Sequence, residues 1–170
     1  MAERSQARSR VVELIVNGRP RELLVRPGTS LLEALREGLG LTAAKRGCSE
    51  GSCGACTVLL DGKAVPSCLV PVETVDGSAV LTLEGTTPAD GSLSELQAAF
   101  VHGFATQCGF CTPGMLVAAQ ALLAENPDPT RADVVRAISG NICRCTGYAS
   151  IVDAILAAAA TRSQTRAGGS

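Results

Sequence analysis

Eight cysteines in two groups constrain this chain more than any other feature of its 170 residues. The first group, spaced C-x4-C-x2-C-x11-C, consists of Cys48, Cys53, Cys56 and Cys68. The second group, spaced C-x2-C-x31-C-x-C, consists of Cys108, Cys111, Cys143 and Cys145. Short spacings let several thiolates reach one metal centre, so the fold must bring the more distant cysteines back to each short loop.

The cellular compartment decides whether such thiols form disulfides or bind metals. The N-terminus, MAERSQARSR, is polar, and the VVELIV that follows is too short and too charged for the apolar core of a secretory signal. We therefore expect a cytoplasmic protein. In that reducing environment cysteines at these spacings are metal ligands rather than disulfides.

Composition argues against two kinds of partner. Aromatic residues make up only 2% of the chain and the net charge is −1, so neither a base-stacking surface nor a basic patch for nucleic acid or membranes is expected. Residues 96–124 contain no charged side chain, but QCGFCTPG at 107–114 interrupts them and would leave backbone groups unpaired in lipid. We expect no membrane span.

The first half predicts an α+β domain over residues 11–86. Asn-Gly at 17–18 and Asp-Gly at 61–62 each lie between short apolar runs, as hairpin turns do. A Ser-x-x-Glu capping box at 30–33 opens a helix, and AVLTLEG at 79–85 predicts a last strand. Two hairpins crossed by one helix predict a β-grasp-like sheet.

The second half predicts a four-helix bundle over residues 87–161, so the fold class is α+β with the sheet domain first. Four helix starts are predicted from their capping residues, at Ser92-x-x-Glu95, Thr112-Pro113, Thr130-x-x-Asp133 and Ser150-x-x-Asp153. Residues 1–10 and 162–170 are polar, and we expect both ends to be disordered.

The first cysteine group matches the spacing of plant-type [2Fe–2S] sites, in which three close cysteines are joined by a fourth further on. Gly47, Gly51 and Gly54 supply the positive-φ and close-approach positions that a loop wrapped around a cluster requires. A structural zinc site is the alternative, although zinc sites usually pair two short knuckles instead of clustering three ligands.

The second group is less specific by spacing alone. Each of its cysteine pairs precedes a predicted helix, and the positive end of a helix favours thiolates and a bound anionic cluster. A second [2Fe–2S] cluster and a zinc site both fit, and a redox-active C-x-x-C dithiol is a third possibility. The neighbouring cluster motif favours iron.

The two motifs together, GCSEGSCGACTV and QCGFCTPGM…GNICRCTGY, closely resemble the small iron–sulfur subunit of the xanthine oxidase family of molybdenum hydroxylases. The resemblance covers residues 12–158. It implies a plant-ferredoxin-like β-grasp domain followed by a helical domain, each of which holds one [2Fe–2S] cluster with four of the eight cysteines. All eight ligand positions match the family motifs.

The resemblance also implies partners and roles. A large subunit would carry molybdopterin with molybdenum and a medium subunit would carry FAD, in a dimer of heterotrimers. Cys145 would bind iron beside the pterin, and Gln107 would hydrogen-bond the same cofactor. Without the resemblance, a local cap or a buried backbone contact explains Gln107 equally well, and Tyr148 is expected only to pack against the bundle.

The chain is therefore expected to be an electron-transfer subunit that relays single electrons between the molybdopterin and the FAD. It contains no residue set that would break a substrate bond, so catalysis would belong to the complex. Two alternatives remain: a free-standing two-cluster ferredoxin-like carrier, and a zinc-stabilised adaptor without a redox role.

Overall fold

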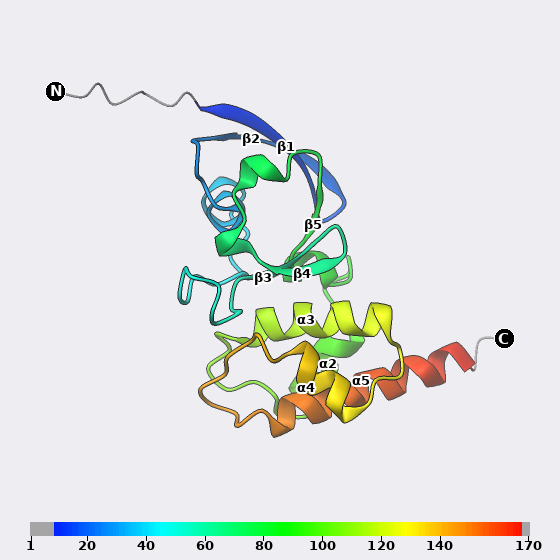
Figure 1. Ribbon diagram of the computed structural model, residues 1–170. Coiled ribbons are helices and arrows are strands. Elements are labelled where there is room, and N and C mark those ends of the chain that lie inside the picture. Colours follow the sequence, from blue (N-terminus) through cyan, green and yellow to red (C-terminus); the bar gives the residue numbers. More distant parts are fainter. Residues whose placement is uncertain (1–8, 168–170) are drawn as a thin grey trace.

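The computed structural model describes residues 9–167, which form a β-sheet unit followed by a helical unit (Figure 1). The sheet has the strand order β2-β1-β5-β3-β4, in which only the β1–β5 pair is parallel. The strands are β1 (Arg10–Val16), β2 (Arg19–Val25), β3 (Thr57–Leu60), β4 (Lys63–Pro66) and β5 (Ala79–Leu81).

Both predicted hairpins are present in this sheet. Asn17 and Gly18 have φ values of 52° and 74°, and Asp61 and Gly62 have values of 48° and 83°. Positive φ at both central residues is the geometry of the tight turns that match the twist of paired strands. The turn residues therefore fix the register of β1 with β2 and of β3 with β4.

The core of the β-sheet unit follows from the alternation along β1. Val12, Leu14 and Val16 point inward and are almost fully buried, while the residues between them face outward. They pack with Leu31 and Leu35, which lie on a short helix that crosses the sheet. That helix has two parts, α1 (Leu31–Glu33) and the π-helical η1 (Ala34–Gly38), and Ser30 caps it as predicted.

Three single-turn helices complete the β-sheet unit, and four longer helices make the helical unit. The single turns are η2 (Ser67–Leu69), η3 (Val72–Thr74) and η4 (Leu83–Thr86). The longer helices are α2 (Glu95–His102), α3 (Thr112–Glu125), α4 (Arg131–Ala137) and α5 (Ala149–Ala167). Helix α3 lies between the sheet and the other three helices and contacts both β3 and β4 (Figure 1).

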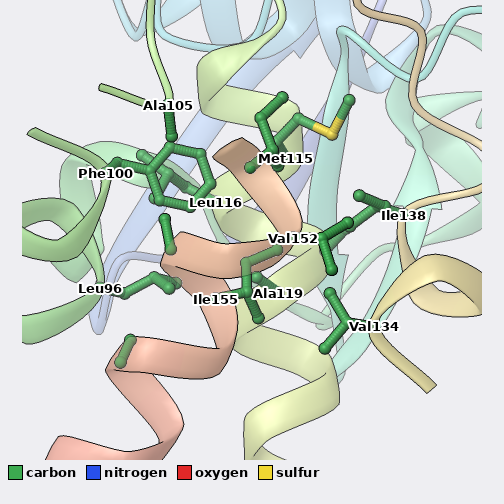
Figure 2. Packing of buried hydrophobic residues seen from close by; sticks show 14 of the residues in the cluster. Leu96, Phe100, Ala105, Met115, Leu116, Ala119, Val134, Ile138, Val152 and Ile155 are labelled. Atoms are coloured by element: carbon green, nitrogen blue, oxygen red, sulfur yellow. The ribbon is translucent and has the colours of Figure 1, made fainter. Parts of the chain in front are cut away.

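The helical unit has its own core. Phe100 from α2, Met115 and Ala119 from α3 and Ile155 from α5 meet in one buried cluster (Figure 2). Phe100 is the only large aromatic side chain buried in the described part of the chain, and alanines fill much of the remaining contact surface. Small side chains let the helices approach closely, so the scarcity of aromatic residues does not prevent tight packing.

Three helix starts differ from the prediction. The N-cap of α3 is Cys111, so the predicted cap Thr112 is already the first helical residue. Helix α2 is capped by Ser94, whose capping box is closed by Gln97, because Ser92 instead hydrogen-bonds Asp90 in the preceding turn. Helix α5 begins at Ala149, one residue before the predicted cap Ser150. The predicted capping box of α4 is confirmed.

The ends of the chain also differ from the expectation of disorder. Arg10 already belongs to β1, and α5 continues to Ala167 instead of ending at residue 161. Arg162 donates to Glu95 at 3.1 Å and to Gln120 at 3.2 Å, so its side chain ties the last turns of α5 to α2 and α3. Residues 1–8 and 168–170, the rest of the expected disorder, lie outside the described residues.

The uncharged segment 96–124 forms α2, a loop and α3 instead of one long helix. Between residues 9 and 167, no helix has both the length and the apolar composition that crossing a bilayer would require.

Candidate metal centres

The first cysteine loop, residues 47–56, carries three thiols of the first group, and Cys68 reaches it from η2. The four thiols lie close enough to interact, most strongly in two pairs. Cys48 pairs with Cys53, and Cys56 pairs with Cys68. The loop thus turns back on itself so that the side chains of its three cysteines and of Cys68 gather on one side.

Backbone conformation explains this turn. Ser49, Gly51 and Gly54 have φ values of 60°, 81° and 67°, in the left-handed region that favours glycine. The expectation for Gly51 and Gly54 is confirmed, and Ser49 adopts the same conformation without being glycine. Gly47 is a close-approach position, as predicted, since a Cβ there would lie 2.7 Å from the Cys53 sulfur.

The thiols of the second group also form two pairs. The sulfurs of Cys108 and Cys145 are 3.5 Å apart and exposed. Cys111 pairs with the buried Cys143. Each pair therefore joins one cysteine from before α3 to one from before α5.

The sequence suggested that the positive ends of α3 and α5 favour thiolates in this group, and the structure does not show this effect. Cys111 is itself the N-cap residue of α3, and its side chain makes no capping hydrogen bond. Burial, followed by its interaction with Cys143, raises the pKa of Cys111 to about 12 in spite of the helix dipole. Residues 146–148 separate Cys145 from α5, so that thiol does not lie at a helix start.

Other thiols are shifted in both directions. Hydrogen bonds from Ser52 and from backbone N–H groups lower the pKa of Cys48 to about 6. Burial raises the pKa of Cys143, but hydrogen bonds from Thr146 outweigh it and leave a pKa of about 7. Burial and the neighbouring Cys56 raise the pKa of Cys68 to about 11. In the metal-free chain, therefore, Cys111, which keeps its proton, faces Cys143, which gives its proton up readily.

The arrangement in pairs distinguishes between metals. Zinc needs four ligands around one ion, whereas each iron of a [2Fe–2S] cluster takes two protein ligands. Two pairs of thiols in each group are therefore a donor set that fits a two-iron cluster better than zinc.

The two cysteine groups meet at a junction between the β-sheet unit and the helical unit. The backbone N–H of Ile142 donates to the carbonyl of Cys53 at 2.9 Å. The buried Asn141 side chain donates to the Gly54 carbonyl at 2.9 Å and to the Thr57 hydroxyl at 3.3 Å. These bonds link the segment just before Cys143 to the first cysteine loop.

Glycine makes this junction close. A Cβ on Gly114 of α3 would overlap the Gly54 carbonyl oxygen and lie 2.9 Å from the Asn141 amide nitrogen. A Cβ on Gly54 would overlap the Gly140 carbonyl oxygen in the same way. The main chains of the two units therefore touch without side chains between them.

Three residues near the cysteine groups have surroundings that the sequence did not indicate. Gln107 is exposed beside Cys108, and within residues 9–167 its side chain takes part in no hydrogen bond, so it is not a local cap. Tyr148 does more than pack, because its hydroxyl accepts a hydrogen bond from the Cys143 N–H at 2.9 Å. The role of Asn141 was missed, because a single Asn before a cysteine carries no recognisable signal.

Two family models match the chain, one over each unit. Residues 14–85 match the 2Fe-2S iron-sulfur cluster binding domain, and residues 82–156 match the [2Fe-2S] binding domain. The nicotinate dehydrogenase small FeS subunit of Eubacterium barkeri is 49% identical over 144 residues, which are 85% of this chain and 91% of that protein. The xanthine dehydrogenase iron-sulfur-binding subunit of Escherichia coli O157:H7 is 46% identical over 147 residues, with 85% and 91% covered.

Solved structures agree with these relatives. Quinoline 2-oxidoreductase from Pseudomonas putida 86 includes a chain with a TM-score of 0.88 and 44% identity, and the match covers 94% of this chain and 98% of that one. The aldehyde oxidoreductase of Desulfovibrio desulfuricans ATCC 27774 has a TM-score of 0.87 and 49% identity over 91% of this chain but only 17% of its own. The same fold therefore occurs both as a separate subunit and as part of a larger chain.

The five-stranded ferredoxin-like sheet, the helical domain and the two cysteine groups all agree with these matches, and the predicted fold class is confirmed. The chain belongs to the small [2Fe–2S] subunits of the xanthine oxidase family of molybdenum hydroxylases, in which it is an iron–sulfur electron-transfer subunit.

Proposed function

We propose that this chain relays single electrons from a molybdopterin site on a large subunit to FAD on a medium subunit. A [2Fe–2S] cluster, when bound, accepts and releases one electron at a time. The chain itself supplies the ligands, the spacing between the two groups and the exclusion of water. The observation that carries the proposal is the presence of one four-cysteine group in each of two matched [2Fe–2S] domains, with the two groups linked by one main-chain junction.

The pairing suggests which thiols share an iron. In the first group, Cys48 and Cys53 would hold one iron and Cys56 and Cys68 the other. In the second group the iron pairs would be Cys108 with Cys145 and Cys111 with Cys143. We place the boundary between the two cluster domains after residue 86, as the sequence suggested, so that they span residues 11–86 and 87–161 with α5 continuing beyond.

The junction would couple the two ligand sets. From the Cys53 carbonyl a single hydrogen bond leads to the Ile142 N–H, and Ile142 is bonded directly to Cys143. This connection contains one non-covalent step and no side chain. Asn141, which is buried beside it, holds the two segments at a fixed separation.

The second group would face the large subunit. Cys108 and Cys145 are the exposed thiols of the chain's described residues, and Gln107 is exposed beside them. Phe104 and Phe110 are large apolar side chains with 84% and 46% of their surface exposed on the same loop. Such a surface suits burial against a partner, with Gln107 and Cys145 next to the pterin.

The first group would then serve the medium subunit and its FAD. By the same resemblance the assembly would be a dimer of heterotrimers in the cytoplasm. The substrate site lies on the large subunit, so this chain does not select the substrate.

Spin counting tests the relay. The complex, purified anaerobically and fully reduced, is expected to contain four irons per small subunit and two distinguishable [2Fe–2S] signals in low-temperature electron paramagnetic resonance (EPR) spectra. One spin per chain would refute the assignment of the second group, and zinc in place of iron would leave only a structural role.

Mass measurement of the intact complex tests the partners. Large and medium subunits with bound molybdenum and FAD are expected to copurify with the chain. Isolation of the chain alone, carrying both clusters and reducing an acceptor, would instead support a free-standing carrier.

A further inference from the structure

The segment that joins Cys143 to α5 is folded by a closed circuit of hydrogen bonds. The Cys143 N–H donates to the Tyr148 hydroxyl at 2.9 Å. The Tyr148 N–H donates to the Thr146 hydroxyl at 3.2 Å. The Thr146 hydroxyl lies 3.1 Å from the Cys143 sulfur, and the Thr146 N–H points to the same sulfur at 3.5 Å.

This circuit fixes the direction of one hydrogen bond. A thiolate that binds iron has no proton and can only accept. The Thr146 oxygen already accepts from the Tyr148 N–H, so its own hydrogen is directed away from that bond and toward the sulfur. The hydroxyl of Thr146 is therefore a donor to Cys143 whenever this thiolate is a ligand.

Backbone strain shows that the segment is held in place. Gly147 and Tyr148 both have left-handed backbones, with φ values of 68° and 69°. A bulky residue in this region costs roughly 1–3 kcal/mol and persists only where its surroundings impose it. Here the strained residue supplies both its N–H and its hydroxyl to the circuit. The conformation is thus tied to the orientation of Thr146 and Cys143.

The other thiols of the second group have no such donor. Cys108 and Cys145 contact each other, and Cys111 contacts Cys143. The hydroxyl of Thr112, the residue after Cys111, lies 3.3 Å from the Thr106 hydroxyl and makes no hydrogen bond to a sulfur among the described residues. Within the described chain, Cys143 is the one thiol of this group that receives a side-chain hydroxyl.

We propose that Thr146 sets the reduction potential of the cluster held by the second group, and that Tyr148 is the positioning residue that orients it. This inference rests on the proposed function, because it requires a [2Fe–2S] cluster on these four cysteines. Reduction adds negative charge to the cluster, and a hydrogen bond to sulfur stabilises the more negative state. The Thr146 hydroxyl therefore raises the potential and makes this cluster easier to reduce.

An EPR-monitored redox titration of the purified complex tests this role. Thr146→Val removes the hydroxyl at nearly constant volume, Thr146→Ser retains it, and Thr112→Val is the matched control beside another ligand. A Cys145→Ser variant, in which oxygen replaces one ligand sulfur, identifies the signal of the second cluster. At a potential where the wild-type cluster is half reduced, Thr146→Val is expected to lower its ratio of reduced to oxidised forms about tenfold, which is ~59 mV for a one-electron couple.

The control variants are expected to behave differently. Thr146→Ser and Thr112→Val should keep the wild-type ratio, and the first cluster should not change in any variant. An unchanged ratio in Thr146→Val, or an equal change in Thr112→Val, would overturn the proposal. If both Thr146→Val and Thr146→Ala lose the second cluster, the hydroxyl acts in assembly, and the tuning role is wrong. Absence of a second cluster signal from the wild-type complex would instead refute the proposed function.

Discussion

Replacing Gly114 with alanine should separate the two cysteine loops. The added Cβ would overlap the Gly54 carbonyl oxygen, and it would lie 2.9 Å from the buried amide nitrogen of Asn141. The carbonyl belongs to the main chain of a loop that also carries ligands, so it cannot move aside as a flexible side chain can. We expect the junction to open slightly and to lose the hydrogen bond between Ile142 and Cys53.

The magnitude follows from the cost of overpacking, which is roughly 1–3 kcal/mol in a well-packed interior. Intrinsic helix propensity acts in the opposite direction, since alanine is favoured over glycine within helices by roughly 0.5–1 kcal/mol. A net loss of about 1–2 kcal/mol is expected. For a chain of this size that corresponds to a decrease in Tm of roughly 2–8 °C.

Gly140→Ala is the matched control. Gly140 lies next to Asn141 at the same junction, but a Cβ there would meet no atom within 4 Å, and its φ is not in the left-handed region. Its substitution should change stability by less than about 1 kcal/mol, because it only reduces the freedom of the unfolded chain.

Two measurements on the intact complex would test this reasoning. Thermal loss of the visible absorbance of the clusters gives the change in Tm. Hydrogen exchange of the segment that contains Ile142 reports opening of the junction directly, and a local loss of about 2 kcal/mol would accelerate it roughly 30-fold. If Gly114→Ala were as stable and as protected as Gly140→Ala, the close contact at the junction would not limit the fold.

Three further expectations concern single groups. Tyr148→Phe leaves the Cys143 N–H without its acceptor, and thermal melting should show a loss of about 1–3 kcal/mol. Hydrogen bonds from Thr130 hold the pKa of Asp133 in the folded state below its ordinary 3.8. The Asp133 carboxylate therefore contributes its full stabilisation above pH 3.8, and this stabilisation is lost as the pH falls through the lower pKa of the folded state. Asp133→Asn should flatten this part of a Tm–pH profile. Iron binding must remove the proton of Cys111, whose pKa is about 12, so anaerobic reconstitution of the metal-free chain should give more cluster per chain at pH 9 than at pH 7.

The sequence was most informative where local chemistry decides the structure. Asn-Gly at 17–18 and Asp-Gly at 61–62 specify hairpin turns because few other residue pairs tolerate positive φ twice in succession. The cysteine spacings were equally informative, because short loops limit which thiols can meet. Both features depend on residues close together in the chain.

Long-range packing was not predictable in the same way. Asn141 reaches Gly54 and Thr57 across more than 80 positions, and nothing near it in the sequence indicates that contact. The start of α2 was misplaced because Ser92 and Ser94 are both good caps, and only the turn at Asp90 decides between them. The end of α5 was placed too early because its polar composition suggested disorder, whereas Arg162 is held by two other helices.

The contact between Gly54 and Gly114 has a consequence for engineering and for divergence of the sequence. Because two main chains meet there beside the Asn141 side chain, the separation of the cluster loops depends on these contacts and not on how the two hydrophobic cores are packed. Substitutions elsewhere in either core can accumulate without altering that separation. A chimera that joins the sheet domain of one relative to the helical domain of another should therefore keep the separation between its two cysteine groups, provided that both glycines and Asn141 are retained.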